Sequence, residues 1–232
     1  MTFDWVDLGL VEYDQAFRFQ ELVHQERCSG TIPDTVIIQV NPPVITIGRS
    51  GSRGNLKVSE EALVRAGVRV LHVSRGGDVT YHGPGQLVIS PVLGLKDLGV
   101  NLRRYVYGLE QVVISLLSLY GIDAGRIDGL PGVWVGNRKI AALGIAVRRG
   151  VTLHGVSLNV QPDLRHFDWI TPCGLEGYGV TSMAACLGRP LDEQQLKSEF
   201  LREFGVEFGA DTSYGSSPGA WWSSWTSNGK SS

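Results

Sequence analysis

Short β-branched runs constrain the fold of this chain most, because they follow one another with turns, not helices, between them. Two of them, Thr35–Val40 and Val44–Ile47, are separated only by an Asn-Pro-Pro turn, which can continue neither a strand nor a helix. Another pair, at 133–135 and 139–147, flanks a tight Gly-Asn-Arg hairpin turn. Consecutive strands of this kind predict an α+β fold, in which a mixed or antiparallel sheet is layered with helices, over a regular βαβ fold.

Apolar spacing and turn residues place the remaining elements and the domain boundary. We expect helices at 13–28, 60–66, 102–120, 181–187 and 193–204. We expect further strands at 2–9, 68–73, 87–95 and 151–160, and a glycine-rich loop at 75–85. The length of 232 residues fits a single domain at 1–210. The stretch 211–232 is rich in Ser, Gly and Trp; it is either a flexible tail or a segment whose tryptophans dock on a partner or close over a site.

Charge and composition exclude several classes of protein. A formal net charge of -2 lacks the basic footprint of a nucleic-acid binder, so we expect no nucleic-acid partner. No uncharged apolar stretch approaches the roughly 18 residues that a membrane span needs. The opening MTFDWVDLGL has no basic segment ahead of an apolar one, so we expect no signal peptide and a cytoplasmic location. Three scattered cysteines are too few for a disulfide framework or a zinc site, and we expect no metal.

Cys173 is the strongest candidate for a nucleophile. Pro172 fixes the backbone before it and Gly174 leaves room after it, so a reacting carbonyl could approach the thiol. A thiol suits acyl transfer from a thioester to an amine. At an ordinary pKa of about 8.5 little of it is thiolate at neutral pH, so a neighbouring group must lower that pKa or take the proton. Most free cysteines are small buried hydrophobes, and residue chemistry alone leaves both interpretations open.

Lys139 opens the apolar run that follows the hairpin turn. It is either a lysine that reaches solvent from the hairpin, or a partly desolvated lysine that favours a nearby thiolate and exchanges its proton. The small residues Ala141, Ala142 and Gly144 would let a ligand chain lie close to the backbone of this strand.

The stretch Arg-Gly-Gly-Asp-Val-Thr-Tyr-His at 75–82 has the glycine density of a loop that exposes backbone N–H groups to a ligand. It lacks the Gly-Lys-Ser/Thr ending of a P-loop and the GxGxxG spacing of a dinucleotide site. Arg75 could meet a phosphate or carboxylate. His82 and His154 are alternative bases for Cys173, in place of Lys139.

Several of these segments, in this order, resemble the lipoyl(octanoyl) transferase family over about 3–208. The matching segments are Arg75-Gly-Gly-Asp-Val-Thr-Tyr-His82-Gly-Pro-Gly-Gln, Gly132-Val-Trp-Val, Arg138-Lys139-Ile-Ala, His154-Gly155-Val-Ser-Leu-Asn159 and Ile170-Thr-Pro-Cys173-Gly. The resemblance implies a fold similar to the catalytic domains of biotin and lipoate protein ligases, and a reaction that uses no ATP, other cofactor or metal.

The resemblance also implies the reaction. Octanoyl-acyl carrier protein would pass its acyl group to Cys173 as a thioester, and Lys139 would tune the thiol. A lysine of a lipoyl domain, in a 2-oxoacid dehydrogenase subunit or the glycine-cleavage H protein, would then accept the group in the first step of protein lipoylation. An acidic carrier protein would dock on a basic rim formed by Arg75, Arg148 and Arg149. The alternative is an ATP-dependent lipoate or biotin-type ligase on the same fold, which would activate a free acid and would not need Cys173.

The resemblance carries over the acyl-binding positions residue by residue. They are Arg75, Gly76, Gly77, Asp78, Val79, Thr80, Tyr81, His82, Ala142, Leu143, Gly144, Gly155, Val156 and Ser157.

Overall fold

A large sheet forms the frame of the molecule in the computed structural model, which describes residues 2–171 and 177–209. Its strands follow the order β1 (Asp4–Leu10), β2 (Thr35–Val40), β6 (Gln86–Val92), β10 (Val151–Asn159), β9 (Arg138–Arg148), β8 (Leu130–Val135) and β7 (Gly125–Ile127). The short strand β11 (Gly179–Val180) pairs in parallel with β9, and β1 pairs in parallel with β2. The other pairs in this sheet are antiparallel, which confirms the predicted α+β class with a mixed sheet.

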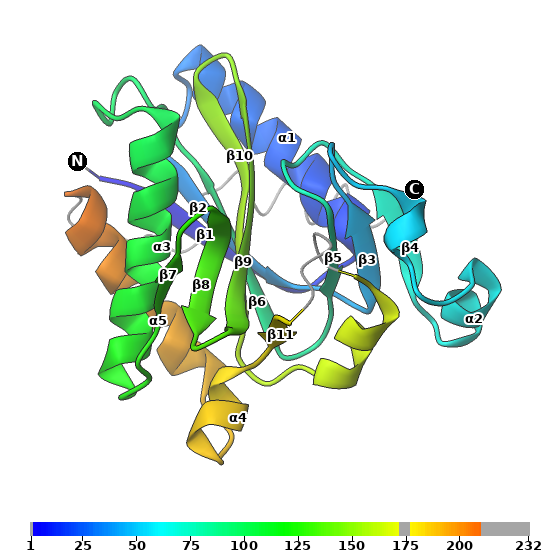
Figure 1. The fold of residues 1–232 in the computed structure, drawn as a ribbon. Coiled ribbons are helices and arrows are strands. Elements are labelled where there is room, and N and C mark those ends of the chain that lie inside the picture. Colours follow the sequence, from blue (N-terminus) through cyan, green and yellow to red (C-terminus); the bar gives the residue numbers. More distant parts are fainter. Residues whose placement is uncertain (1, 172–176, 210–232) are drawn as a thin grey trace.

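A smaller sheet lies beside the large one, on the right of Figure 1. Its strands have the order β4 (Arg69–His72), β3 (Val44–Ile47) and β5 (Val79–His82). A second core cluster lies under this sheet, with Leu63 of α2 (Glu60–Arg65) packed against it. Two short 3-10 helices, η1 (Arg53–Asn55) and η2 (Leu164–Trp169), complete this part of the fold.

Strand β5 corrects the prediction of a loop throughout 75–85. It pairs with β3 along its whole length, from Val79 to His82. Val79 and Tyr81 pack into the small core, whereas Thr80 and His82 point to the other side and line a cavity, which Val79 also borders. The glycines on both sides of these four residues hid this alternation in the sequence.

Helices cover both faces of the large sheet (Figure 1). Val36 and Ile38 of β2 belong to the main core, under α3 (Leu102–Leu119) and α5 (Glu193–Phe208). Ile37, between them, packs instead with Phe19 and Val23 of α1 (Tyr13–Ser29). This alternation is the two-residue period of a strand buried on both faces. The remaining helix, α4 (Met183–Leu187), follows β11.

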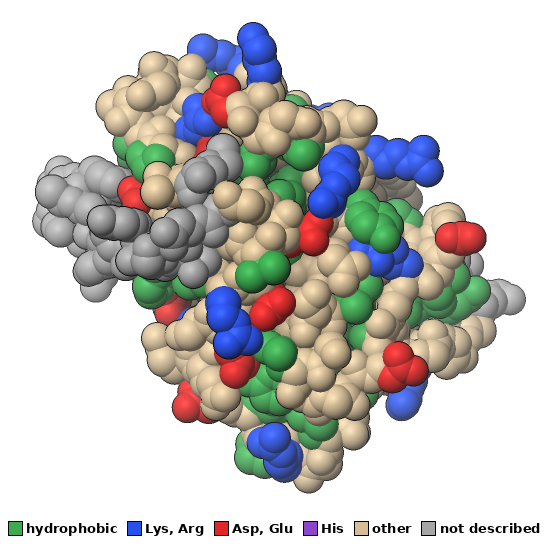
Figure 2. Space-filling view, turned by 90° about the vertical axis from the view of Figure 1, so that its left-hand side faces the viewer, with side chains coloured by type: hydrophobic (Ala, Val, Ile, Leu, Met, Phe, Trp, Pro, Cys, Tyr) green, Lys and Arg blue, Asp and Glu red, His purple; other side chains and the backbone are tan. Residues whose placement is uncertain are grey.

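The face formed by α3 and α5 carries acidic and basic side chains interspersed (Figure 2). An ion pair between Arg104 and Glu207, 2.6 Å long, joins the two helices there. Among the described residues, no helix is long and apolar enough to cross a membrane.

Most predicted elements are confirmed within a few residues of their expected bounds, because their end signals act as expected. Ser59, for example, accepts a hydrogen bond from the Ala62 N–H at the start of α2. The structure adds β7 and β11, which the sequence did not predict. The stretch 211–232 lies outside the described residues, so the division at residue 210 stays a prediction.

Candidate active site

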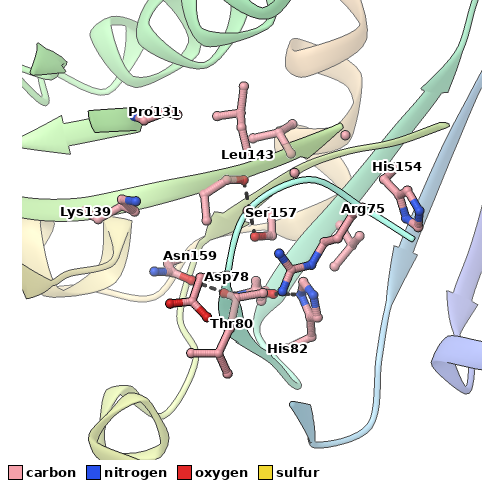
Figure 3. Close-up of a pocket in the computed structure, with 18 of the residues that line it drawn as sticks. Arg75, Asp78, Thr80, His82, Pro131, Lys139, Leu143, His154, Ser157 and Asn159 are labelled. Atoms are coloured by element: carbon pink, nitrogen blue, oxygen red, sulfur yellow. Dashed lines mark hydrogen bonds between the residues drawn. The ribbon is translucent and has the colours of Figure 1, made fainter. Parts of the chain in front are cut away.

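A cavity of about 930 Å³ lies between the two sheets. Val88, Ser157 and Ala142 lie directly across from one another on β6, β10 and β9, so their side chains share the face that forms one wall. The chain from residue 75 to 80 lines the cavity from the small-sheet side, and α1 contributes Phe17. Figure 3 shows Lys139 at one end of the site and His154 at the other.

Lys139 is the second residue of β9 and is half-buried at its end of the cavity. The hairpin from β8 places it across from Trp134, and its Nζ lies 4.7 Å from the centroid of the Trp134 ring. On the other side of β9, the Thr181 N–H donates a hydrogen bond to the Lys139 carbonyl at 3.0 Å. The side chain therefore belongs to the cavity wall instead of extending from the hairpin into solvent.

Cys173 lies outside the described residues, so its role and its approach to Lys139 stay predictions. The described residues on either side of it are held by hydrogen bonds to other parts of the chain. Before it, the Thr171 N–H donates to the Asn55 carbonyl at 2.8 Å. After it, the Asn137 side chain, in the turn that precedes β9, donates to the Gly177 carbonyl at 3.1 Å. The neighbours of Thr171 and Gly177 in the chain, Ile170 and Tyr178, line the cavity.

Arg75 is buried, which corrects its predicted place on a basic docking rim. Its guanidinium donates to the Thr46 carbonyl at 2.7 Å, to the Thr46 hydroxyl at 3.0 and 3.1 Å, and to the Gly76 carbonyl at 3.0 Å. A charge held by several protein acceptors inside the wall cannot also form an exposed docking surface. Arg148 and Arg149 are exposed, and their predicted docking role is untested.

Glycines let the loop that begins at Arg75 lie directly on β9. The Gly76 N–H donates to the Ile145 carbonyl at 3.1 Å. A Cβ on Gly144 would lie 2.8 Å from Arg75 Cδ and 3.1 Å from the Gly76 carbonyl. The small residues of this strand therefore let the Arg75–Gly76 segment pack directly on β9, in addition to leaving space for the cavity.

A buried chain of hydrogen bonds sets which nitrogen of His82 carries the proton. The Asn159 amide nitrogen donates to the Thr181 carbonyl, so its oxygen accepts from the Gln86 amide nitrogen at 2.8 Å. The Gln86 oxygen is then the acceptor for His82 Nδ1–H at 2.7 Å. The other ring nitrogen, Nε2, accepts from the Thr46 hydroxyl at 3.3 Å. Both nitrogens of His82 are therefore engaged inside the protein.

Both candidate histidine bases are neutral at ordinary pH. Burial, followed by the positive charge of Arg75, lowers the pKa of His82 to about 4 and that of His154 to about 3. His154 Nε2 lies 3.0 Å from the Ser74 hydroxyl, and its ring stacks on Phe17 with centroids 5.0 Å apart. These contacts hold the imidazoles as fixed, uncharged parts of the wall.

The structure brings most of the predicted acyl-binding residues together. Those that line the cavity are Arg75, Gly76, Gly77, Asp78, Val79, Thr80, His82, Ala142, Leu143, Gly144, Gly155, Val156 and Ser157. Tyr81 is the exception, because its ring packs in the small core and its hydroxyl lies 2.7 Å from His166 Nδ1.

Among the residues that were not assigned roles from the sequence are four that contact the predicted site residues, Asn159 through Gln86 and the others directly. Gln86, Asn159 and Trp134 stand inside the segments that carried the family resemblance, and that position is the signal that could have identified them. Thr46, which contacts both His82 and Arg75, comes from β3 and stands in no such segment.

Comparison with known proteins defines the class to which this fold and site belong. Residues 12–205 match the family model of the lipoyl protein ligase A/B catalytic domain. The structure of lipoate-protein ligase A bound with ATP superposes with a TM-score of 0.80 at 16% identity, over 98% of this chain and 94% of that chain. Biotin protein ligase from Aquifex aeolicus superposes with a TM-score of 0.51 at 11% identity, over 98% and 75%. The predicted similarity to these catalytic domains is confirmed as a similarity of fold.

Sequence similarity narrows the class to one family. The octanoyltransferase of Caldicellulosiruptor saccharolyticus is 46% identical over 200 residues, which cover 85% of each chain. The chain therefore belongs to the octanoyltransferase family, and it is an acyltransferase, as the resemblance implied.

Proposed function

We propose that this protein transfers an octanoyl group from octanoyl-acyl carrier protein to a lysine of a lipoyl domain, through a thioester on Cys173. The acceptors are lipoyl domains of 2-oxoacid dehydrogenase subunits and the glycine-cleavage H protein, in the cytoplasm. One observation carries the proposal: Lys139 lines the end of a largely apolar cavity and pairs with Val180 of β11, the described strand that follows Cys173 in the chain. A cation and an alkyl-binding wall are what a thiol needs to become a thiolate that accepts a fatty acyl group.

The reaction has two balanced steps. In the first, the neutral amine of Lys139 takes the proton of the Cys173 thiol and becomes the ammonium that stabilises the thiolate, and the thiolate attacks the thioester carbonyl of the donor. The carbon–sulfur bond to the carrier breaks, and the carrier thiolate takes the proton back from Lys139. In the second, the acceptor amine attacks the Cys173 thioester, an amide forms, and the Cys173 sulfur leaves. The proton that the amine loses returns to this sulfur through Lys139.

The cavity wall supports an alkyl substrate. Val88 and Ala142 lie on the face of the large sheet that lines it, and Leu143 adds apolar surface from β9. Each buried CH₂ group contributes about 0.8 kcal/mol of binding free energy, so an eight-carbon chain gains several kcal/mol over a short one.

Lys139 is a better partner for the thiol than either histidine. His82 has both ring nitrogens bound within the protein, and His154 contacts Ser74 through Nε2. Burial also makes both rings weak bases, with pKa values of about 4 for His82 and about 3 for His154, so neither holds the thiol proton well. Both histidines instead position the wall of the acyl site.

The decisive assay mixes the protein, octanoyl-acyl carrier protein and a purified lipoyl domain without ATP. We expect the mass of the lipoyl domain to rise by one octanoyl group on one lysine. A parallel reaction supplies free octanoate and ATP and should give no transfer. The opposite pattern, transfer from octanoate and ATP but not from the carrier, would instead establish the ATP-dependent ligase.

The nucleophile is tested separately by intact-mass measurement of the protein after reaction with the donor alone. We expect a covalent octanoyl adduct in the wild type and in Cys186→Ala, a matched control from α4. Cys173→Ala should show no adduct. An adduct of equal yield in Cys173→Ala would refute the assignment.

A further inference from the structure

The ammonium of Lys139 lies over an aromatic ring whose position is fixed. Its Nζ is 4.7 Å from the ring centroid of Trp134, which is 3% exposed. The indole N–H donates to the Leu130 carbonyl at 3.1 Å. The ring of Tyr178 meets Trp134 edge-on, with centroids 5.3 Å apart and the planes at 66°. These contacts on two sides leave the indole little freedom to turn away from the lysine.

The stem of the Lys139 side chain lies against a glycine. A Cβ on Gly132 would lie 3.1 Å from Lys139 Cε, 3.3 Å from its Cδ and 2.8 Å from the Ala141 carbonyl. Gly132 has a φ of +127°, which side-chain-bearing residues rarely adopt. Any other residue here would strain the backbone and press on the lysine stem.

A buried carboxylate holds this glycine in place. Glu110 of α3, 7% exposed, accepts a hydrogen bond from the Gly132 N–H at 3.0 Å. Its other oxygen accepts from Arg126 at 2.9 Å. The Arg126 guanidinium in turn lies 3.7 Å from the ring centroid of Tyr107. The helix thus fixes the strand residue on which the lysine stem rests.

We propose that Trp134, Gly132 and Glu110 form a lysine support that holds Lys139 as a positioned cation and thereby sets how much of Cys173 is thiolate. The inference rests on the proposed function, and the three residues act on the thiol only through Lys139. The face of an indole attracts an ammonium ion, and a nearby ammonium favours a thiolate over a thiol. A nucleophile with more thiolate reacts faster at neutral pH.

The test measures the pH dependence of iodoacetamide alkylation in the intact protein without substrate, read for each cysteine by peptide mass spectrometry. In Trp134→Leu we expect alkylation of Cys173 at pH 7 to slow about three- to tenfold and its midpoint to move to higher pH. Trp134→Phe keeps an aromatic face and should slow it less, by about twofold. Cys28 and Cys186 serve as internal controls and should react at unchanged rates.

A second background separates this role from simple packing. In Lys139→Met the cation is gone, so adding Trp134→Leu should slow alkylation no further. Equal slowing by Trp134→Leu in both backgrounds, or no slowing in the wild-type background, would overturn the lysine support and leave the proposed function standing. Alkylation unchanged in Lys139→Met alone would instead overturn the pairing of Lys139 with Cys173. If Trp134→Leu does not fold, the same comparison is made with Trp134→Phe.

Discussion

At the scale of single residues, the fold strongly controls the protonation of two histidines in the cavity wall, His82 and His154. Their pKa values, about 4 and about 3, lie below the ordinary value of 6.5 because burial penalises the charged ring. Between pH 6.5 and these lower values, the unfolded chain therefore binds more protons than the folded one. Each histidine contributes stability that is fully present above pH 6.5 and is lost as the pH falls through this window.

The consequence is a stability loss on mild acidification. We expect each histidine to lower the free energy of unfolding by about 2 kcal/mol between pH 7 and pH 5. In His154→Asn, this pH-dependent loss should shrink by about that amount, because one titrating group is gone. Asn suits the positive φ of +59° at this position. Urea unfolding of both proteins at the two pH values measures the difference.

The wild-type protein, unfolded under the same conditions, is the reference for this difference. If His154→Asn retains the full wild-type difference, His154 is not held neutral by burial.

At the scale of elements, the sequence predicted the helices and strands whose own residues carry a strong local pattern. α1 and α3 have helical apolar spacing, and β2 and β3 are β-branched runs with a turn between them, so their bounds agree closely with the structure. β5 was missed because glycines surround its four residues. β11 has two residues, Gly179 and Val180, and exists only because it pairs with β9. Such pairing is a tertiary event with no local pattern.

Gly155 shows how one strand fits against its neighbour. A Cβ there would lie 2.1 Å from the Ile89 carbonyl of β6 and 2.9 Å from Pro91 Cδ. Backbone cannot move aside without breaking sheet pairing, so Gly155→Ala should destabilise the protein by about 3 kcal/mol. Gly125→Ala, on the edge strand β7 with nothing within 4 Å, should change stability by less than about 0.5 kcal/mol. Denaturant unfolding that gave equal values for both variants would contradict this packing.

At the scale of the whole molecule, the site joins parts of the chain that are far apart in sequence. The hydrogen-bonded chain from Thr46 through His82, Gln86 and Asn159 runs from β3 to β10 and ends on the Thr181 carbonyl, beside β9. The acyl-binding positions that the family resemblance implied, Tyr81 excepted, all line this cavity although they come from three separate stretches of the sequence. The resemblance could not reveal Thr46, nor the burial of Arg75, because both depend on how the small sheet packs against the large one.

A cavity with an apolar wall should select ligands by the length of their alkyl chain. In Cys173→Ala, where no thioester forms, we expect the affinity for straight-chain alkanoates to rise about fourfold per CH₂ from butanoate to octanoate, because the carboxylate is constant along the series. Isothermal titration calorimetry measures each dissociation constant. Leu143→Asn, made on the same background, places a polar group in the wall and should reduce the gain per CH₂. Leu119→Asn, at the exposed end of α3, should leave the gain unchanged. An affinity that does not depend on chain length would show that the acyl chain binds elsewhere.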